Sequence, residues 1–272
     1  MNPPAFKSFF SSRRLFFIAL LFAASVIRAE EINLEKVKAE ADKGNAEAQN
    51  NLGTMYFQGQ GVKKDDTEAL KWFRKAAEQG DAMAQDSFGR MLAHGQGAPK
   101  DTKEAAKWFE KAAEQGLVPA QIHLGTLYYF GDTGSKNYPE AAKWLRRAAT
   151  AGNAWAQNTL GVMYQHGMGV STDPKEAAAW YRKAAEQGNA KAQSNLGQMY
   201  ASGTGVKKEN AQAYLWLTLA KERGEVTGQN FLKEFSADLS PEQIAEGNRL
   251  VEDYRLKLAK AQESQAAAAS GK

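Results

Sequence analysis

The stretch "KWFRKAAEQGDAMAQ", Lys71–Gln85, returns three times in closely similar form. The copies read "KWFEKAAEQGLVPAQ" from Lys107, "KWLRRAATAGNAWAQ" from Lys143 and "AWYRKAAEQGNAKAQ" from Ala179. Its glycine and its tryptophan recur every 36 residues, as Gly44, Gly80, Gly116, Gly152, Gly188 and Gly224, and as Trp72, Trp108, Trp144, Trp180 and Trp216. A fixed period of this length indicates a chain built from stacked structural repeats.

Each repeat carries the start and stop signals of two helices. In the first copy we expect helices over about 45–58 and 66–79. Asp65, with Glu68 three residues later, is a helix N-cap, and the glycine that ends "AAEQG" closes a helix in the left-handed conformation. The residue after each such glycine is able to cap the next helix, as in Asn45, Asp81, Asn153 and Asn189.

Glycine also stands inside the first helix of every repeat, at Gly53, Gly89, Gly125, Gly161 and Gly197. Each glycine should cost about 1 kcal/mol relative to alanine, so a gain in packing has to offset it. We expect a close approach to the small residues of the paired helix, Ala69, Ala105, Ala141, Ala177 and Ala213. The "GxG" between the helices is interpreted as a turn, because no strand precedes it as a phosphate-binding loop requires.

The unit that begins "AEAQNNLGTMYFQGQG" resembles the Sel-one-like repeat, a relative of the tetratricopeptide repeat, over residues 45–224 in five copies. The resemblance implies an all-α fold, a right-handed α-solenoid of antiparallel helix pairs. The third copy departs from the pattern in its turn, where Thr133 replaces the second glycine. We therefore expect a different loop shape there.

The flanking segments complete the predicted domain plan. Residues 1–29 are predicted to be a signal peptide and 30–44 an N-terminal capping helix. Residues 225–261 are predicted to be a C-terminal pair of capping helices, and 262–272 a disordered tail. Capping elements are expected because a terminal repeat would otherwise expose its apolar face.

The first segment has the layout of a secretory signal, with Lys7, Arg13 and Arg14 ahead of an apolar run over 15–24 and then small residues. The run is shorter than the roughly 20 residues of a membrane span, so an uncleaved anchor is the less favoured alternative. Cleavage after Ser25 and cleavage after Ala29 both fit. We predict a periplasmic or secreted protein that does not insert into the membrane once the signal is cleaved.

The charge of the chain belongs to that signal. Lysine and arginine number 35 against 31 acidic residues, and removal of residues 1–29 leaves 31 against 31. Nucleic acid and anionic lipid are therefore not expected as partners. The basic residues that recur on the second helices are interpreted as a solvated outer face. The chain has no cysteine, which excludes disulfides, a cysteine nucleophile and a lipoprotein anchor.

Little in the sequence favours an enzyme. The three histidines, His94, His123 and His166, form no HExxH motif, so we expect no catalytic residue, no metal and no cofactor. The alternative is a cell-wall-related hydrolase or a β-lactam-interacting enzyme, by analogy with exported, cysteine-rich relatives. This chain lacks their cysteines.

The resemblance implies that the first helices line a concave face that binds a protein or peptide partner, in envelope signalling, assembly or host contact. Fixed positions of the tetratricopeptide groove, carried onto this sequence, give the candidate contacts Asn50, Phe57, Asp86, Arg90, His94, Ile122, Tyr129, Phe130, Trp155, Asn158, His166, Lys191 and Gln198. These positions vary between copies, as contacts to an asymmetric partner would.

Three of these aromatic residues each admit two interpretations. Trp155 is the tryptophan outside the 36-residue ladder, and it is either an interface anchor or a ring packed on the neighbouring repeat. Tyr129 and Phe130 either contact the partner or cover the irregular third turn.

Overall fold

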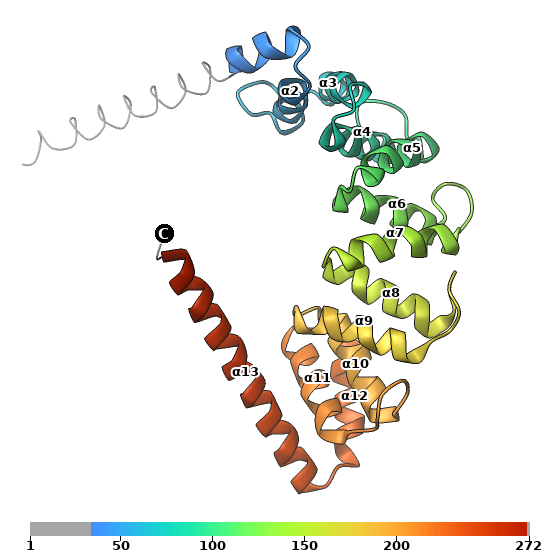
Figure 1. The fold of residues 1–272 in the computed structure, drawn as a ribbon, viewed down its shortest axis with the longest axis vertical. Helices are drawn as coiled ribbons and strands as arrows, with labels where there is room; N and C mark the ends of the chain where they lie inside the picture. Colours follow the sequence, from blue (N-terminus) through green and yellow to red (C-terminus); the bar gives the residue numbers. More distant parts are fainter. Residues whose placement is uncertain (1–33, 271–272) are drawn as a thin grey trace, which may run out of the picture. The chain divides into compact units, whose positions relative to one another are not determined.

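A computed structural model describes residues 34–270 of the chain, with side chains to residue 268 (Figure 1). The described residues form α-helices joined by turns and contain no strand. The predicted signal peptide and the first residues of the predicted N-terminal cap lie outside the described residues. No helix among those described is both long enough and apolar enough to cross a membrane.

The chain divides into two compact units at Leu117 and Val118. The first unit contains a helix over 34–42 and then α2 (Ala46–Gln58), α3 (Asp66–Glu78), α4 (Ala82–His94) and α5 (Thr102–Glu114). The second contains α6 (Val118–Phe130), α7 (Tyr138–Thr150), α8 (Ala154–His166), α9 (Pro174–Glu186), α10 (Ala190–Ser202), α11 (Asn210–Glu222), α12 (Val226–Ala237) and α13 (Pro241–Ser270). Within each unit, consecutive helices pack on one another as the pairs of an all-α solenoid, as the repeat predicts.

The predicted N-caps are confirmed. The side chain of Asn153 accepts a hydrogen bond of 2.9 Å from the backbone N–H of Ala156 at the start of α8, and Asn45, Asp81 and Asn189 cap α2, α4 and α10 in the same way. Asp65 accepts from two backbone N–H groups at the start of α3. The start of each of these helices is therefore determined by a residue next to it in the sequence.

The glycines inside the first helices allow a close approach of the paired helix. A Cβ on Gly89 would lie 3.3 Å from the backbone oxygen of Ala105, and one on Gly197 would lie 3.2 Å from that of Ala213, but a larger side chain comes closer still. A Cβ on Gly161 would lie 2.6 Å from Cε1 of the Tyr181 ring, and one on Gly125 would lie 2.7 Å from Cγ of Leu145. The atoms that need the space thus belong to the large core residue of the paired helix, four positions after the alanine that the sequence indicated. The ring of Tyr181 is fully buried, so it has no room to move aside.

The second glycine of the "GxG" turn is needed for stacking between repeats. Gly169 has φ +70°, and a Cβ there would lie 2.2 Å from the carbonyl carbon of Tyr138, at the start of the preceding second helix. Gly205 approaches the carbonyl oxygen of Pro174 equally closely. In the third copy the positive φ angles fall on Gly131 and Gly134, and no described non-glycine residue has one, so Thr133 changes the turn as expected.

Glutamine side chains join three helices in a row, a feature that the sequence analysis did not predict. Gln157 of α8 donates its amide N–H to the carbonyl oxygen of Ala149 in α7, at 3.0 Å. Its own oxygen accepts from Gln187 at the end of α9, at 2.7 Å. Gln85 and Gln115 repeat this arrangement in the first unit. Because Gln157 is buried, these bonds satisfy polar atoms that water cannot reach.

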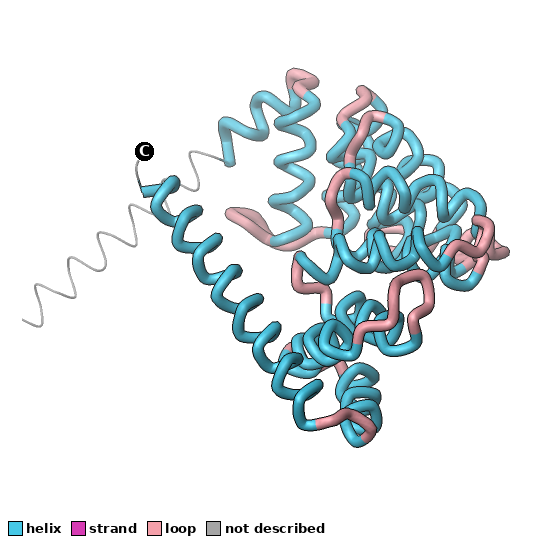
Figure 2. The backbone as a smooth tube through the Cα atoms, turned by 60° about the horizontal axis from the view of Figure 1, so that its bottom comes forward, coloured by secondary structure: helices cyan, strands magenta, loops and turns pink. Residues whose placement is uncertain are grey.

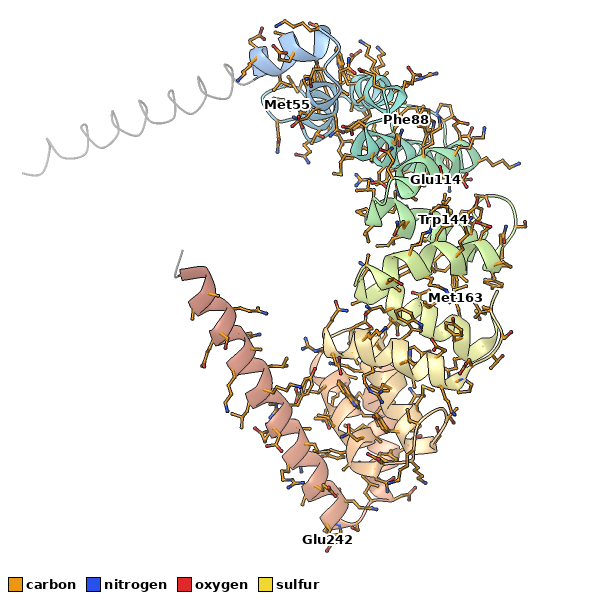
Figure 3. The ribbon with its side chains drawn as sticks, in the orientation of Figure 1. Met55, Phe88, Glu114, Trp144, Met163 and Glu242 are labelled. Atoms are coloured by element: carbon orange, nitrogen blue, oxygen red, sulfur yellow. The ribbon has the colours of Figure 1, made fainter. Side chains whose placement is uncertain are left out.

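The core lies between the helices of each pair and between successive pairs. Figure 3 labels Trp144 and Met163, which are both almost completely buried in the second unit. Alanines of the second helices fill the close contacts around such large side chains, as Ala148 and Ala184 do. This packing leaves one face of each first helix free for other contacts.

The C-terminal helices differ from the predicted plan. α13 packs on α11, with the ring of Tyr254 edge-on to Trp216 at 5.3 Å. It then continues as a single helix to Ser270, through most of the stretch predicted to be disordered (Figure 2). The structure therefore contradicts the prediction of disorder for residues 262–270. The run of alanine over 266–269 explains the helix, since alanine has the highest helix propensity.

Candidate partner-binding groove

A groove of about 400 Å³ lies on the first helices of the second unit. Five of the predicted contact residues line it together: Tyr129 and Phe130 from α6, Trp155 and Asn158 from α8, and Lys191 from α10. Three successive repeats therefore contribute to one site. All five stand at positions carried over from the tetratricopeptide groove.

The helical period separates the groove from the core. On α8, Trp155, Asn158 and Val162 lie three, four and seven residues apart and share the groove face. Leu160 and Met163 lie on the other side of the same helix and are fully buried. α8 thus packs with one face and offers the other to a ligand.

The aromatic end of the groove has two exposed rings. Phe130 is 58% exposed and Trp155 is 39% exposed, although both are large apolar residues. Tyr129 is half-buried, lies edge-on to Phe130 at 5.1 Å and to Tyr138 at 5.6 Å, and donates its hydroxyl to the sulfur of Met168 at 3.8 Å. Burial raises the pKa of the Tyr129 phenol, with Tyr138 adding to the effect. Tyr129 therefore contacts the start of α7 and the turn after α8, and it also lines the groove.

The polar end of the groove has two side-chain hydrogen bonds. Asn195 donates to the side-chain oxygen of Asn158 at 3.2 Å, and Gln198 donates to the hydroxyl of Ser194, also at 3.2 Å. Asn158 and Ser194 are buried, whereas Lys191 is exposed and forms no ion pair within the described residues. Gln198, a predicted contact, does not line the groove itself but is hydrogen-bonded to Ser194, which does.

Of the six other lining residues, Val162 and Ser194 also stand at tetratricopeptide positions. The sequence analysis missed the remaining four, Thr159, Asn195, Glu225 and Thr227. Thr159 and Asn195 occupy the same position of successive repeats, and Glu225 occupies the position of the N-caps Asn153 and Asn189. The 36-residue period relates Thr159 to Asn195 and Asn189 to Glu225, so it could have identified these lining positions. They were missed because the tetratricopeptide positions do not include them. Glu225 accepts from the backbone N–H of Gly228 and caps α12.

The other predicted contacts of the second unit lie outside this groove. Ile122 packs against the core, and His166 is exposed at the end of α8. The predicted contacts of the first unit form a separate set on α2 and α4: Asn50, Phe57, Asp86, Arg90 and His94. Arg90 and His94 are exposed, whereas Asp86 is 6% exposed.

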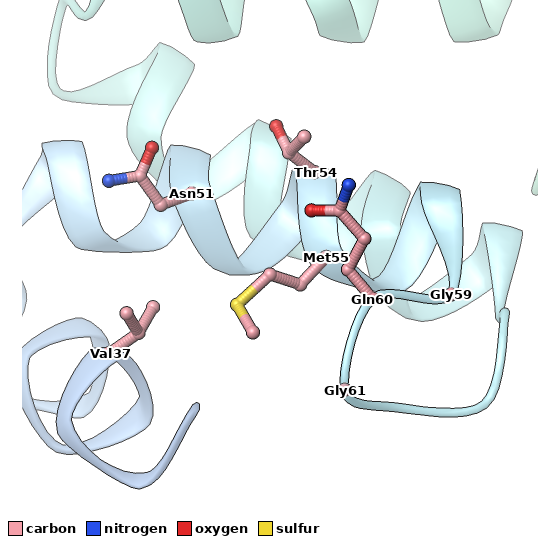
Figure 4. Close-up of a pocket in the computed structure, with 7 residues that line it drawn as sticks. All are labelled: Val37, Asn51, Thr54, Met55, Gly59, Gln60 and Gly61. Carbon is pink, nitrogen blue, oxygen red and sulfur yellow. The ribbon is translucent and has the colours of Figure 1, made fainter. Parts of the chain in front are cut away.

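A second pocket, of about 680 Å³, lies in the first unit (Figure 4). It is lined by Val37 of the helix over 34–42, by Asn51, Thr54 and Met55 of α2, and by the turn 59–61. Met55 is half-buried there, although its equivalents Met91, Met163 and Met199 are buried. This pocket contains no aromatic ring and no charged side chain, so the groove of the second unit is the better candidate for a protein partner.

The described residues supply few groups for catalysis. No group of three or more histidine, aspartate or glutamate side chains in this part of the chain could hold a metal ion. His94 and His166 are exposed near the ends of their helices. The groove instead combines apolar rings, amides, hydroxyls, one carboxylate and one ammonium group, which are the groups of a binding surface.

Comparison with known proteins agrees with the repeat seen in the sequence. The sequence model of the Sel1 repeat family matches five segments of the chain, residues 46–81, 82–117, 118–153, 156–189 and 190–225. The crystal structure of a Sel1 repeat protein from Oxalobacter formigenes is similar with a TM-score of 0.72 and 33% sequence identity, over 89% of this chain and 99% of that one. Its similarity therefore extends over nearly the whole of both chains.

Two longer relatives match over smaller parts. The structure of c5321, a protective antigen of uropathogenic Escherichia coli with an SLR fold, is 29% identical with a TM-score of 0.53, over 83% of this chain and 56% of that one. The secretory immunoglobulin A-binding protein EsiB of Escherichia coli is 51% identical over 45 residues, which is 16% of this chain and 9% of EsiB. The Sel1 repeat matches cover more than half of the sequence, and so the chain belongs to the Sel1 repeat family.

Proposed function

We propose that this chain is an interaction scaffold that binds a segment of a protein partner in the groove formed by α6, α8, α10 and the start of α12. Solenoids of Sel1 repeats are typically scaffolds for protein interactions. The observation that carries the proposal is the pair of exposed rings, Phe130 and Trp155, beside the buried amide of Asn158 on the same groove. Amphipathic rings in such surroundings are the residues that most often dominate binding energy.

The setting that we propose is the cell envelope or the outside of the cell. Of the relatives, EsiB is named for binding secretory immunoglobulin A, and c5321 is described as a protective antigen. Both descriptions fit contact with a host protein. Activity by binding, without catalysis, is part of the same proposal.

Replacement of Trp155 with alanine tests the groove. We expect a change of no more than about 1 kcal/mol in the free energy of unfolding, because the ring is exposed, and a loss of about 2 kcal/mol or more in binding. Denaturant unfolding and a binding titration with the purified partner measure the two quantities. A loss of stability with unchanged affinity would mean that the ring is a packing element of its repeat.

Trp180 provides the matched control, because it belongs to the 36-residue ladder and lies on the second helix α9, outside the groove. Trp180→Ala should leave the affinity unchanged in the fraction of protein that remains folded by circular dichroism. An equal loss of affinity in both variants would contradict a specific role of the groove.

Crosslinking identifies the partner for that titration. A photoreactive phenylalanine analogue at Phe130 should capture a protein that the same analogue at Trp180 does not capture. The captured protein counts as the partner when, after purification, it binds the purified wild-type chain in a titration.

We further propose that the chain is exported by its first segment and is periplasmic or secreted. The basic residues Arg13 and Arg14, the short apolar run after them and the small residues that follow support this. Native protein recovered from the periplasm or the medium should lack the first 25 or 29 residues by mass spectrometry. Recovery of the intact chain from the cytosol would contradict export.

A further inference from the structure

On the basis of the proposed function, we propose that the groove takes an extended peptide segment of the partner, in which a large apolar side chain stands close to an acidic one. The apolar residue would lie against Phe130 and Trp155, the peptide main chain against Asn158 and Asn195, and the acidic residue near Lys191. Three sets of contacts carry this inference, and each comes from a different helix or pair of helices.

The aromatic rings require an apolar partner group. Phe130 and Trp155 line the groove together with Val162, and Tyr129 holds its place beside Phe130 through its own contacts. Burying these rings removes a large apolar area from water, which is favourable if the ligand is also apolar there. A volume of about 400 Å³ holds a few side chains, whereas a helix with its side chains is about 10 Å across or more.

The two asparagines match the groups of a peptide bond. Asn195 donates to the oxygen of Asn158, and this one bond leaves the N–H₂ of Asn158 and the oxygen of Asn195 without a hydrogen bond in the described part of the chain. The pair therefore offers both N–H donors and a carbonyl acceptor, which match the C=O and N–H groups of a peptide main chain. An extended segment has main-chain groups free to pair with them, whereas a helical segment uses its own internally.

Lys191 selects the charge of the ligand. Its exposed ammonium group lies on the groove face one repeat beyond Trp155, with no ion pair to it in the described residues. Glu225 also lines the groove, but its carboxylate is bound to the backbone N–H of Gly228 at the start of α12, where the helix dipole favours it. Lys191 is the one basic side chain among the residues that line the groove. Its electrostatic complement on the ligand is an acidic side chain.

The test uses a phage-displayed library of random dodecapeptides, selected on the purified chain without its first 29 residues. Selected peptides are then made with a fluorescent label and titrated by anisotropy. We expect enrichment of a large apolar residue with aspartate or glutamate within about three positions. Lys191→Glu should weaken these peptides at least tenfold, and exchange of their acidic residue for lysine should restore binding to that variant.

Two further variants separate the contacts. Lys175→Glu makes the same change of charge on α9, outside the groove, and should alter affinity by less than twofold. Asn195→Ala should weaken peptides of every sequence by a similar factor, because a main-chain contact does not depend on the side chains of the ligand.

The outcomes distinguish this inference from the proposed function. If selected peptides lose affinity with Trp155→Ala but show no acidic enrichment and no effect of Lys191→Glu, the acidic specificity is wrong and the groove remains the binding site. If peptides bind equally well to the wild type and to Trp155→Ala, the groove itself is wrong. Selection of helical amphipathic peptides without a requirement for Asn195 would overturn the extended mode of binding.

Discussion

Replacing Trp144 with alanine should lower the free energy of unfolding by about 3 to 5 kcal/mol. The ring is 1% exposed in α7, and truncation would leave a cavity among residues that are themselves closely packed. The ring also makes two cation–π contacts: the guanidinium of Arg147 lies 4.5 Å and the ammonium of Lys143 lies 5.0 Å from the ring centre. These interactions would be lost with the ring.

Denaturant unfolding followed by circular dichroism measures this loss, and Trp155→Ala is the internal comparison. Both changes remove the same side chain, but one ring is buried and the other is 39% exposed. The difference in unfolding free energy between the two variants therefore reports burial and not residue type. Equal losses would show that Trp155 has a packing role like that of Trp144.

Replacing Gly169 with alanine should cost about 2 to 5 kcal/mol. The left-handed backbone at φ +70° contributes about 1 to 2 kcal/mol of this for a residue with a Cβ. The new Cβ would also lie 2.2 Å from the carbonyl carbon of Tyr138, and the resulting overpacking contributes about 1 to 3 kcal/mol more. The same unfolding measurement applies.

Gly61→Ala is the matched control for this prediction. Gly61 occupies the same turn position with φ +68°, but the nearest atom to a Cβ there is the methyl carbon of Met55 at 3.7 Å. Gly61→Ala should therefore show the backbone cost alone, and the difference between the variants measures the contact between successive repeats. Equal losses would show that this glycine is needed for its backbone angle and not for stacking.

Much of the fold could be predicted because its signals are local. The caps Asn45 and Asp65 act on backbone N–H groups within three residues, and the glycine after each "AAEQ" ends the helix beside it. The fixed period then indicates that each pair packs on a copy of itself, which predicts the solenoid and the groove face of the first helices. The residues Tyr129, Phe130, Trp155, Asn158 and Lys191 come instead from the resemblance to the tetratricopeptide repeat, whose groove positions were carried onto this sequence.

Two features of the fold were not predicted, each for a different physical reason. The partner of Gly161 is the ring of Tyr181 and not the facing alanine, and which of the two approaches depends on how far the helices are offset along their axes. The segment 262–270 is helical because alanine has the highest helix propensity. Disorder was predicted from its small and polar residues, and composition alone does not show which of the two tendencies is stronger.

The sequence by itself determined the repeat and the boundaries of the helices within it, because these follow from interactions within one or two turns of the chain. The tertiary structure alone decided that Asn158 meets Asn195, that Gln157 joins α7 to α9, and that the residues of three repeats form one groove. Such contacts depend on the relative placement of helices, which results from the packing of many side chains at once.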